Sequence, residues 1–461
     1  MVFSSITFLF FFLPILLGTY YIVPNKAKNI VLLLASILFY FWGEPTYGWV
    51  MIFSIICTYV FVILMDKYKK NSKIFLILAL FICVGILVYF KYTNFLIENI
   101  NLWLKDKIDF IYVILPIGIS FYTFQLISYI IDVYRGQAKV QKNILKLAMY
   151  ISLFPQLIAG PIVRYTTIEK QLENRVHTFQ KFALGVRRFI IGLGKKVLIA
   201  NVLGELANIF LSSNDNSVLF YWLYGISAML QIYFDFSGYS DMAIGLGKMF
   251  GFEFLENFNY PYIATNITDF WRRWHISLSS WFRDYIYIPL GGNRVNKIKW
   301  IRNIMIVWLL TGLWHGAAWN FVIWGVYFGI LLIIEKLFLE KYLKKLPQFI
   351  GRLYVLFLVM ISFIIFNAES IPQIIKNIGG ILGITSNSLI STESLYYLKS
   401  YFLVIIIAIL GATPIFSKIA TKNKISKIAN FLEPAYLLII LVTCTSYIIN
   451  SSFNPFLYFR F

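Results

Sequence analysis

The sequence predicts an all-α polytopic membrane protein, on three observations. Hydrophobic residues make up 59% of the 461 residues and charged residues only 13%, whereas soluble domains carry about 25% charged residues. The mean hydropathy is +0.74. Apolar stretches near the roughly 20 residues that a transmembrane helix needs recur along the whole chain. These observations exclude an ordinary soluble enzyme.

Apolar stretches that could cross a bilayer form a series from one end of the chain to the other. They cover residues 4–23, 30–43, 47–65, 74–90, 110–134, 197–211, 218–236, 303–319, 320–339, 353–367, 400–417 and 432–449. The first stretch lacks a basic leading region and a small-residue cleavage site, so we expect a retained helix and not a removed signal peptide.

Charge in the connecting loops predicts the orientation. The basic loops are 24–29, 66–73, 135–146, 336–352 and 418–427, and the near-neutral loops are 44–46, 91–109, 212–217 and 368–399. Lys and Arg accumulate in cytoplasmic loops. This alternation predicts a multi-pass protein of the cell membrane with both termini extracytoplasmic. It also accounts for the net charge of +20 without a nucleic-acid partner.

Two segments do not fit a plain span. Residues 147–163 are apolar but contain Pro155, Gly160 and Pro161, and they lie between two basic segments. We expect a re-entrant hairpin there, because broken backbone at membrane depth is tolerated where protein buries it. Residues 237–302 mix aromatic, Gly, Pro and charged residues. We expect interfacial or re-entrant helices on the cytoplasmic side, in contact with membrane lipid.

The chain has only three histidines. His177 lies in a basic loop, where a solvated role is expected, and His275 lies in WRRWHISLS, where it could contact lipid or substrate. His315 lies in the hydrophobic stretch IVWLLTGLWHGAAWNFVIWG. An ionisable group at membrane depth marks a functional site by default, and a neutral His can accept a proton from a hydroxyl or thiol. The small residues around His315 fit either access for a substrate or close helix packing.

Other chemistry-bearing residues are few. Asp235 and Asp241 could orient a base or line a polar tunnel. Cys57, Cys83 and Cys444 each lie in an apolar run and have no metal-ligand spacing, so we expect structural roles for them. The sequence contains no P-loop, zinc motif or nucleophile elbow, so no metal and no tightly bound cofactor are expected.

Several long motifs resemble the membrane-bound O-acyltransferase family. The pairing of WRRWHISLSSWFRDYIYIPLGGNR with LTGLWHGAAWNFVIWG carries the family resemblance. The runs FSSITFLFFFLPI, LPIGISFYTFQLISYIIDVYRG and LFPQLIAGPIVRY are similar to its bacterial polysaccharide branch. That branch contains the alginate O-acetyltransferases and peptidoglycan homologues, and the D-alanyl transfer protein of teichoic acid synthesis is a close relative.

The resemblance implies a fold and a site. The fold would be a ring of tilted transmembrane helices around a central funnel, with re-entrant cytoplasmic helices. His315 would be the catalytic histidine, and His275 the second motif histidine on the cytoplasmic side. We expect an acyltransferase membrane domain over 1–431 and a C-terminal transmembrane helix with its tail over 432–461.

The last residues, SSFNPFLYFRF, are similar to the aromatic C-terminal motif of the small partner peptide in teichoic acid D-alanylation. This similarity implies that Tyr458 carries the acyl group transiently. The alternative is an aromatic anchor at the membrane interface.

Together these features predict transfer of an acetyl group from cytoplasmic acetyl-CoA across the membrane to an extracytoplasmic polysaccharide. The resemblance implies an SGNH-type O-acetyltransferase as the partner outside. The donor phosphates could be held by charge-assisted hydrogen bonds from Arg272, Arg273, Arg283 and Arg294. The alternatives are a polysaccharide or lipid transporter, a structural scaffold, or D-alanyl transfer to teichoic acid.

Overall fold

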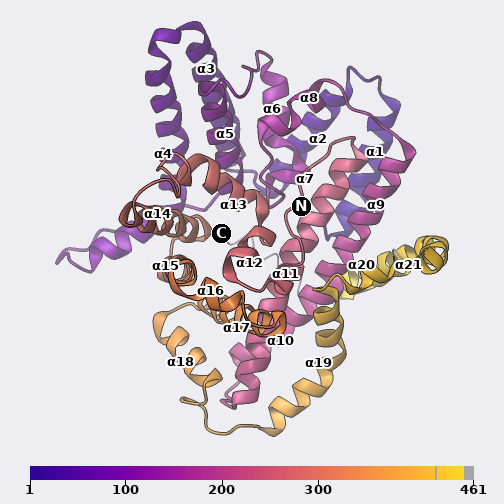
Figure 1. The fold of residues 1–461 in the computed structure, drawn as a ribbon. Helices are drawn as coiled ribbons and strands as arrows, with labels where there is room; N and C mark the ends of the chain where they lie inside the picture. Colours follow the sequence, from indigo (N-terminus) through magenta and orange to yellow (C-terminus); the bar gives the residue numbers. More distant parts are fainter. Residues whose placement is uncertain (421–422, 451–461) are drawn as a thin grey trace. The chain divides into compact units, whose positions relative to one another are not determined.

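The computed structural model describes residues 1–420 and 423–450, with side chains described outside 420–430. This part of the chain is helical (Figure 1) and contains no named strand, only an isolated β-bridge between Ser217 and Ser388. The predicted all-α class is therefore confirmed.

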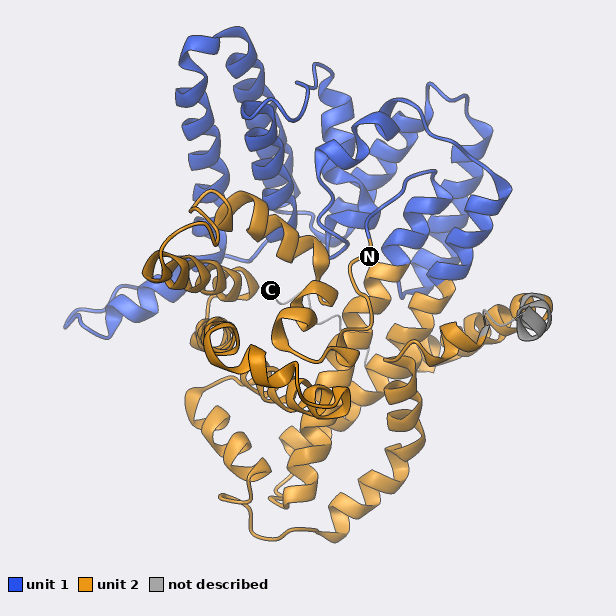
Figure 2. Cartoon of the chain, in the orientation of Figure 1, with its two compact units in different colours: residues 1–189, 242–255, 458–461 blue, residues 190–241, 256–457 orange. Residues whose placement is uncertain are grey.

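The chain divides into two compact units (Figure 2). Among the described residues, the first contains Met1–Phe189 and Met242–Leu255, and the second contains Ile190–Asp241 and the described residues from Glu256 to Asn450. Two helices, α9 and α11, contribute residues to both units.

The helices of the first unit are mostly apolar and follow one another closely in sequence. They are η1 (Thr7–Phe12), α1 (Leu13–Ile22), α2 (Lys28–Gly43), α3 (Gly48–Lys67), η2 (Lys69–Asn71), α4 (Ser72–Asn101), α5 (Ile119–Tyr134), α6 (Ile144–Ser152), α7 (Phe154–Leu157), α8 (Tyr165–Glu173) and α9 (Phe179–Gly194).

The second unit combines long helices with short ones. They are η3 (Lys195–Ala200), α10 (Asn201–Ser212), α11 (Val218–Met249), η4 (Pro261–Ile263), α12 (Ile267–Arg273), α13 (Ile276–Phe282), η5 (Arg283–Tyr287), α14 (Lys297–His315), α15 (Trp319–Ile334), η6 (Glu335–Leu339), α16 (Glu340–Leu343), α17 (Gln348–Asn367), α18 (Ile371–Ile381), α19 (Thr392–Gly411), α20 (Ile415–Ala420) and α21 (Asn423–Asn450). The predicted division at residue 431 falls within α21 and stays a prediction.

Six helices in the described part are long and apolar enough to cross a bilayer. They are Gly48–Lys67, Lys69–Asn101, Trp319–Leu343, Gln348–Asn367, Thr392–Gly411 and Phe431–Asn450. Thr7–Ile22 and Lys28–Gly43 are shorter apolar helices. The multi-pass class is confirmed, although the sequence predicts more spans than these. One difference is the stretch 110–134, in which the helix begins only at Ile119.

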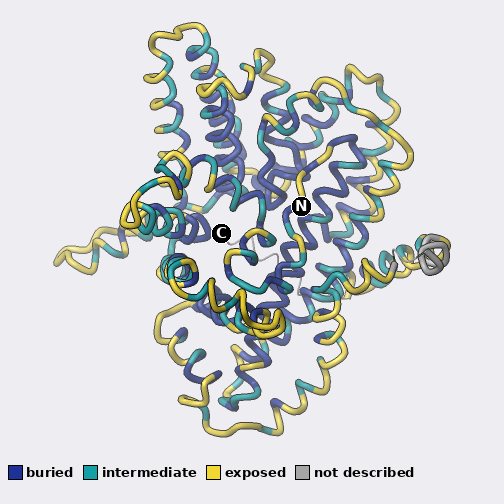
Figure 3. Tube along the Cα trace, in the orientation of Figure 1, coloured by how far each residue is buried: buried dark blue, intermediate teal, exposed yellow. Residues whose placement is uncertain are grey.

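Burial distinguishes the helices of the first unit (Figure 3). In α5 every residue from Ile119 to Ile130 is buried, so this helix is surrounded by protein. In α4 most of the apolar surface is exposed. A surface of that kind suits contact with lipid.

The two unusual segments are both irregular. Within 147–163, α6 ends at Ser152 and α7 follows after a break at Leu153. Every residue from Met149 to Val163 is buried. Its re-entrant topology stays a prediction. The segment 237–302 begins differently from expectation, because α11 continues unbroken to Met249. Short helices and loops follow.

Helices α9 and α11 are each divided between the two units, and in each unit glycines allow the two helix segments to pack closely. In the first unit, a Cβ on Gly185 would lie 2.7 Å from the Gly245 carbonyl oxygen, and the reverse distance is also 2.7 Å. In the second unit, a Cβ on Gly238 would lie 2.8 Å from the Gly192 carbonyl oxygen. This close contact explains the continuation of α11, which carries one wall of the site described next.

Candidate active site

His315 is the last residue of α14 and lies where the chain turns into α15. Gly316 and Ala318 after it are extended, with φ of −173° and −153°. The sequence predicts His315 inside a span, whereas the structure places it at a helix end. A side chain at a helix end can be approached along the helix axis as well as from the side.

Three aromatic rings from three helices surround the His315 imidazole. The ring centroids of Trp314 and Trp324 each lie 5.0 Å from that of His315, and the centroid of Phe366 lies 5.3 Å away. All three contacts are edge-on, at 79–80°. His315 is only 3% exposed. The imidazole is therefore held in one orientation in an environment of low polarity.

The small residues next to His315 are required by helix packing. A Cβ on Gly312 would lie 2.3 Å from the Phe321 carbonyl oxygen, and a Cβ on Gly325 would lie 2.4 Å from the Trp308 carbonyl oxygen. A Cβ on Gly316 would lie 2.1 Å from the Phe321 ring. Of the two explanations that the sequence leaves open, close packing of α14 on α15 accounts for these glycines.

His275 lies between α12 and α13 with a left-handed backbone, φ 43° and ψ 55°. It is fully buried. The Phe236 ring of α11 packs edge-on against its imidazole, with centroids 4.6 Å apart. Burial lowers the pKa of His275 to about 3, because a desolvated site disfavours the charged form.

A buried amide holds His275 in place. The Asn257 Oδ1 lies 3.1 Å from His275 Nδ1 and accepts hydrogen bonds from the Ser277 backbone N–H, at 3.2 Å, and from its hydroxyl, at 2.9 Å. The Asn257 Nδ2 donates to Ser240 Oγ at 2.9 Å. Asn257 and both serines were not among the site residues predicted from the sequence. An Asn within the aromatic run NFNYPY was the available signal.

The two histidines share one neighbour. The Trp314 ring lies 5.9 Å from the His275 ring and 5.0 Å from the His315 ring, centroid to centroid. The fold thus brings together two motif histidines that are far apart in sequence, both buried and both against the same indole. This pair is the candidate active site.

The two aspartates proposed near the site are ion-paired with consecutive lysines of η3. Asp235 Oδ1 lies 2.6 Å from Lys196 Nζ, with both side chains 2% exposed. Asp241 Oδ2 lies 2.7 Å from Lys195 Nζ. Removal of one partner from a buried pair leaves a desolvated charge. These residues therefore keep α11 and η3 in register.

His177 belongs to the first unit and to a different environment. Its Nε2 lies 2.8 Å from the hydroxyl of Tyr20, which is fully buried. The same hydroxyl donates to the Phe250 carbonyl oxygen and accepts from the Arg175 guanidinium. The solvated role expected for His177 is only partly right, because the side chain is half-buried.

Comparison with known proteins identifies the family. Residues 34–372 match the family model described as MBOAT, membrane-bound O-acyltransferase family. The chain belongs to this family. It is a membrane-bound O-acyltransferase, and the resemblance in its motifs is confirmed. The matched range contains both histidines of the candidate active site.

Named relatives of this acyltransferase act on different polymers. A protein named probable alginate O-acetylase from Azotobacter vinelandii is 43% identical over 380 residues, covering 80% of this chain and 76% of its own. A peptidoglycan O-acetyltransferase from Helicobacter pylori is 36% identical over 427 residues, covering 84% and 81%. A teichoic acid D-alanyltransferase from Bacillus subtilis is 35% identical over 246 residues, covering 50% and 60%.

The four arginines predicted to hold donor phosphates lie in the second unit of the acyltransferase. Arg273 Nε donates to Asp269 at 3.0 Å, and Arg283 Nε donates to Asp284 at 2.7 Å. Arg272 and Arg294 are exposed. Their phosphate-binding role stays a prediction. Tyr458, the predicted acyl carrier, lies outside the described residues.

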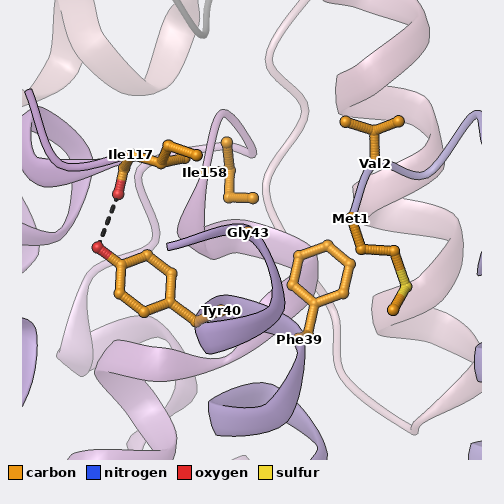
Figure 4. Close-up of a pocket in the computed structure, with 7 residues that line it drawn as sticks. All are labelled: Met1, Val2, Phe39, Tyr40, Gly43, Ile117 and Ile158. Atoms are coloured by element: carbon orange, nitrogen blue, oxygen red, sulfur yellow. Dashed lines mark hydrogen bonds between the residues drawn. The ribbon is translucent and has the colours of Figure 1, made fainter. Parts of the chain in front are cut away.

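One cavity in the first unit, of about 230 Å³, is apolar (Figure 4). It is lined by Met1, Val2, Phe39, Tyr40, Gly43, Ile117 and Ile158. The Tyr40 hydroxyl donates to the Ile117 carbonyl oxygen at 2.9 Å. The lining includes no histidine, acid or basic side chain, so the cavity offers no group for acyl transfer.

Among the described residues, no group of three or more His, Cys, Asp or Glu side chains lies close enough together to hold a metal ion.

Proposed function

We propose that this acyltransferase moves an acetyl group from cytoplasmic acetyl-CoA across the membrane for O-acetylation of an extracytoplasmic polysaccharide. The observation that supports this most directly is the pair of buried histidines that both contact Trp314. The names of the alginate and peptidoglycan relatives support a glycan acceptor. An SGNH-type transferase outside the cell would complete the transfer.

The proposed first step forms an acyl-tyrosine. His315 accepts the phenol proton of Tyr458 while the phenol oxygen attacks the thioester carbonyl. The carbon–sulfur bond breaks, and the thiolate of coenzyme A takes the proton from His315. A phenol has a pKa near ~10, so it leaves more readily than a sugar alkoxide would. The acetyl group can therefore pass from Tyr458 to the external transferase, which places it on a sugar hydroxyl.

The donor and the acceptor would approach from opposite faces. Acetyl-CoA is polyanionic, and transfer of its phosphates through hydrocarbon would be costly. Arg272, Arg273, Arg283 and Arg294 would hold those phosphates on the cytoplasmic side, so that only the acetyl group passes. Cysteines introduced in loop 66–73 should resist impermeant reagents in intact cells, and cysteines in 368–399 should react. The opposite pattern would contradict this orientation.

Radiolabelled acetyl-CoA tests the proposal in membranes that contain the partner transferase and its glycan. The wild type should place label on the glycan and should carry an acetyl adduct on its C-terminal peptide by mass spectrometry. Tyr458→Phe keeps the aromatic ring and removes one oxygen, so it should insert normally and lose both signals. Full activity of Tyr458→Phe would reduce the tail to an interfacial anchor.

D-Alanyl transfer is the second candidate, because the Bacillus subtilis relative is 35% identical over half of this chain. Parallel assays with a labelled D-alanyl thioester and labelled acetyl-CoA separate the two donors. A transporter or scaffold, in contrast, predicts that neither label depends on His315.

A further inference from the structure

The Asn257 amide determines which nitrogen of His275 carries the proton. A backbone N–H can only donate, and the Ser277 N–H points at the Asn257 side-chain atom 3.2 Å away. That atom must therefore be the oxygen, which leaves Nδ2 to donate to Ser240 Oγ. The orientation of this amide follows from the backbone and needs no assumption about the histidine.

With the amide oriented, the proton on His275 can be placed. Its Nδ1 lies 3.1 Å from Asn257 Oδ1, which can only accept, so Nδ1 carries a hydrogen. The Ser277 hydroxyl lies 3.5 Å from Nδ1 but gives its hydrogen to the same oxygen, at 2.9 Å. The neutral ring therefore carries its lone pair on Nε2.

This Nε2 is an acceptor that the described part of the protein leaves open. It is buried and has no hydrogen-bond partner among the described residues. A buried polar atom without a partner is energetically unfavourable, so a bound group that donates a hydrogen bond to it is favoured. The Phe236 and Trp314 rings lie beside the imidazole, with centroids 4.6 Å and 5.9 Å from its own. A buried acceptor nitrogen next to two aromatic rings suits a ligand that donates a hydrogen bond from an N–H group.

We propose that Asn257 is a positioning residue that holds His275 in its Nδ1–H tautomer, so that Nε2 accepts a hydrogen bond from an amide N–H on the thioester arm of the acyl donor. This assignment rests on the proposed function. It gives the two histidines different tasks: His315 moves the proton, and His275 fixes the donor. A general base works best with a pKa near the operating pH, and the low pKa of His275 suits an acceptor better than a base.

Asn257→Asp is the sharpest test because it keeps the shape and the accepting oxygen. The new carboxylate would favour protonation of His275, as an opposite charge does. Protonated Nε2 can no longer accept. In Asn257→Asp, the KM for acetyl-CoA should therefore rise by up to about tenfold from about pH 8 to about pH 5. The wild-type KM should stay flat over that range, and kcat of the variant should change little at high pH.

The groups facing His275 are accounted for in this test. Phe236 and Ser240 on α11, Ser277 on α13 and Trp314 on α14 do not titrate in that range. Asp235 and Asp241 on α11 are paired with lysines. His315 also contacts Trp314, so direct binding of coenzyme A should be measured in a His315→Gln background. Asn257→Asp is compared there with Asn257, because the coenzyme A phosphate also titrates over this range and does so equally in both proteins.

Two further variants keep the proposal falsifiable. Asn257→Ala should raise the dissociation constant for coenzyme A about tenfold, the loss of one hydrogen bond of about 1.4 kcal/mol. Ser362→Ala, which removes a buried hydroxyl on α17, is the matched control and should leave binding unchanged. If Asn257→Ala does not insert, Asn257→Asp carries the test alone.

The outcomes separate the two proposals. No binding of coenzyme A by wild type would contradict the proposed donor. Wild-type binding with an Asn257→Asp constant that is flat with pH would contradict the positioning role.

Discussion

Two histidine clusters, one in each unit, differ in how completely the protein satisfies them. Around His177, the Tyr20 hydroxyl occupies Nε2 and is itself bonded to Phe250 and Arg175. Around His275, the part of the chain that the structure describes bonds only Nδ1 and leaves Nε2 open. A closed cluster stabilises the fold, whereas an open acceptor in a buried site indicates ligand binding.

Charge separates the clusters as well. The pKa of His177 is lowered by burial first and then by the positive charges of Lys28 and Arg175. The pKa of His275 is lowered by burial alone. The His177 cluster is thus cationic and partly solvated, and the His275 site is uncharged and fully buried. Position in the chain does not distinguish them, because both histidines follow basic residues in the sequence.

The largest expected difference is in activity. His315→Ala should lower glycan acetylation by about 10²–10⁴, the effect of removing a positioned general base. His177→Ala should keep acetylation within about twofold of wild type, because nothing places it at the reaction. Initial rates with purified protein of verified monodispersity, supplied with the partner transferase and its glycan, measure both. Near-equal losses in the two variants would remove the distinction between the clusters.

Next is the stability of the closed cluster. Tyr20→Phe removes the hydroxyl that satisfies His177, Arg175 and the Phe250 carbonyl. Loss of such a partner from a buried network costs about 1–3 kcal/mol. Thermal unfolding in detergent should show a lowered midpoint, while acetylation per folded molecule stays at the wild-type value. A fall in specific activity would mean that the first unit takes part in the reaction.

These outcomes bear on what the sequence could predict. Composition determines the membrane class, and the rarity of histidine in an apolar chain singles out His315 and His275. The run NFNYPY could have drawn attention to Asn257, but its role could not be predicted, because that role depends on a left-handed turn at His275 that brings residues 257 and 277 together. The glycines near His315 were ambiguous, since small residues suit both access and packing until the partner helix is known.

The number of spans was harder still. Helix α11 continues past residue 236 because Gly238 meets Gly192 closely, a tertiary contact that hydropathy does not encode. Likewise, 110–118 is apolar but not helical. Hydropathy reports burial in lipid or in protein without separating the two.

The pH dependence of stability should report His275. Its pKa is about 3 in the folded protein and near ~6.5 when unfolded. Between these values the unfolded state binds more protons, so stability falls as the pH decreases from about 6.5 toward 3. His275→Gln cannot titrate, and its unfolding midpoint should fall less steeply over that range. If the unfolding midpoints of the wild type and His275→Gln fell equally with decreasing pH, His275 would be exposed to water in the folded protein.

The smallest expected effect comes from Lys28, at the edge of the closed cluster. Its Nζ lies 5.2 Å from the Tyr20 ring centroid and 5.5 Å from that of Tyr21. Lys28→Met keeps the apolar stem and removes the charge, so unfolding should be easier by about 0.5–1 kcal/mol. The loss of a nearby positive charge should also raise the pKa of His177 toward its ordinary value. Carbon-13 NMR of labelled histidines measures this shift, and the His275 signal serves as the internal control because no charge contributes to its pKa. A shift at His275 of equal size would show that the two clusters share one electrostatic environment and would end the comparison between them.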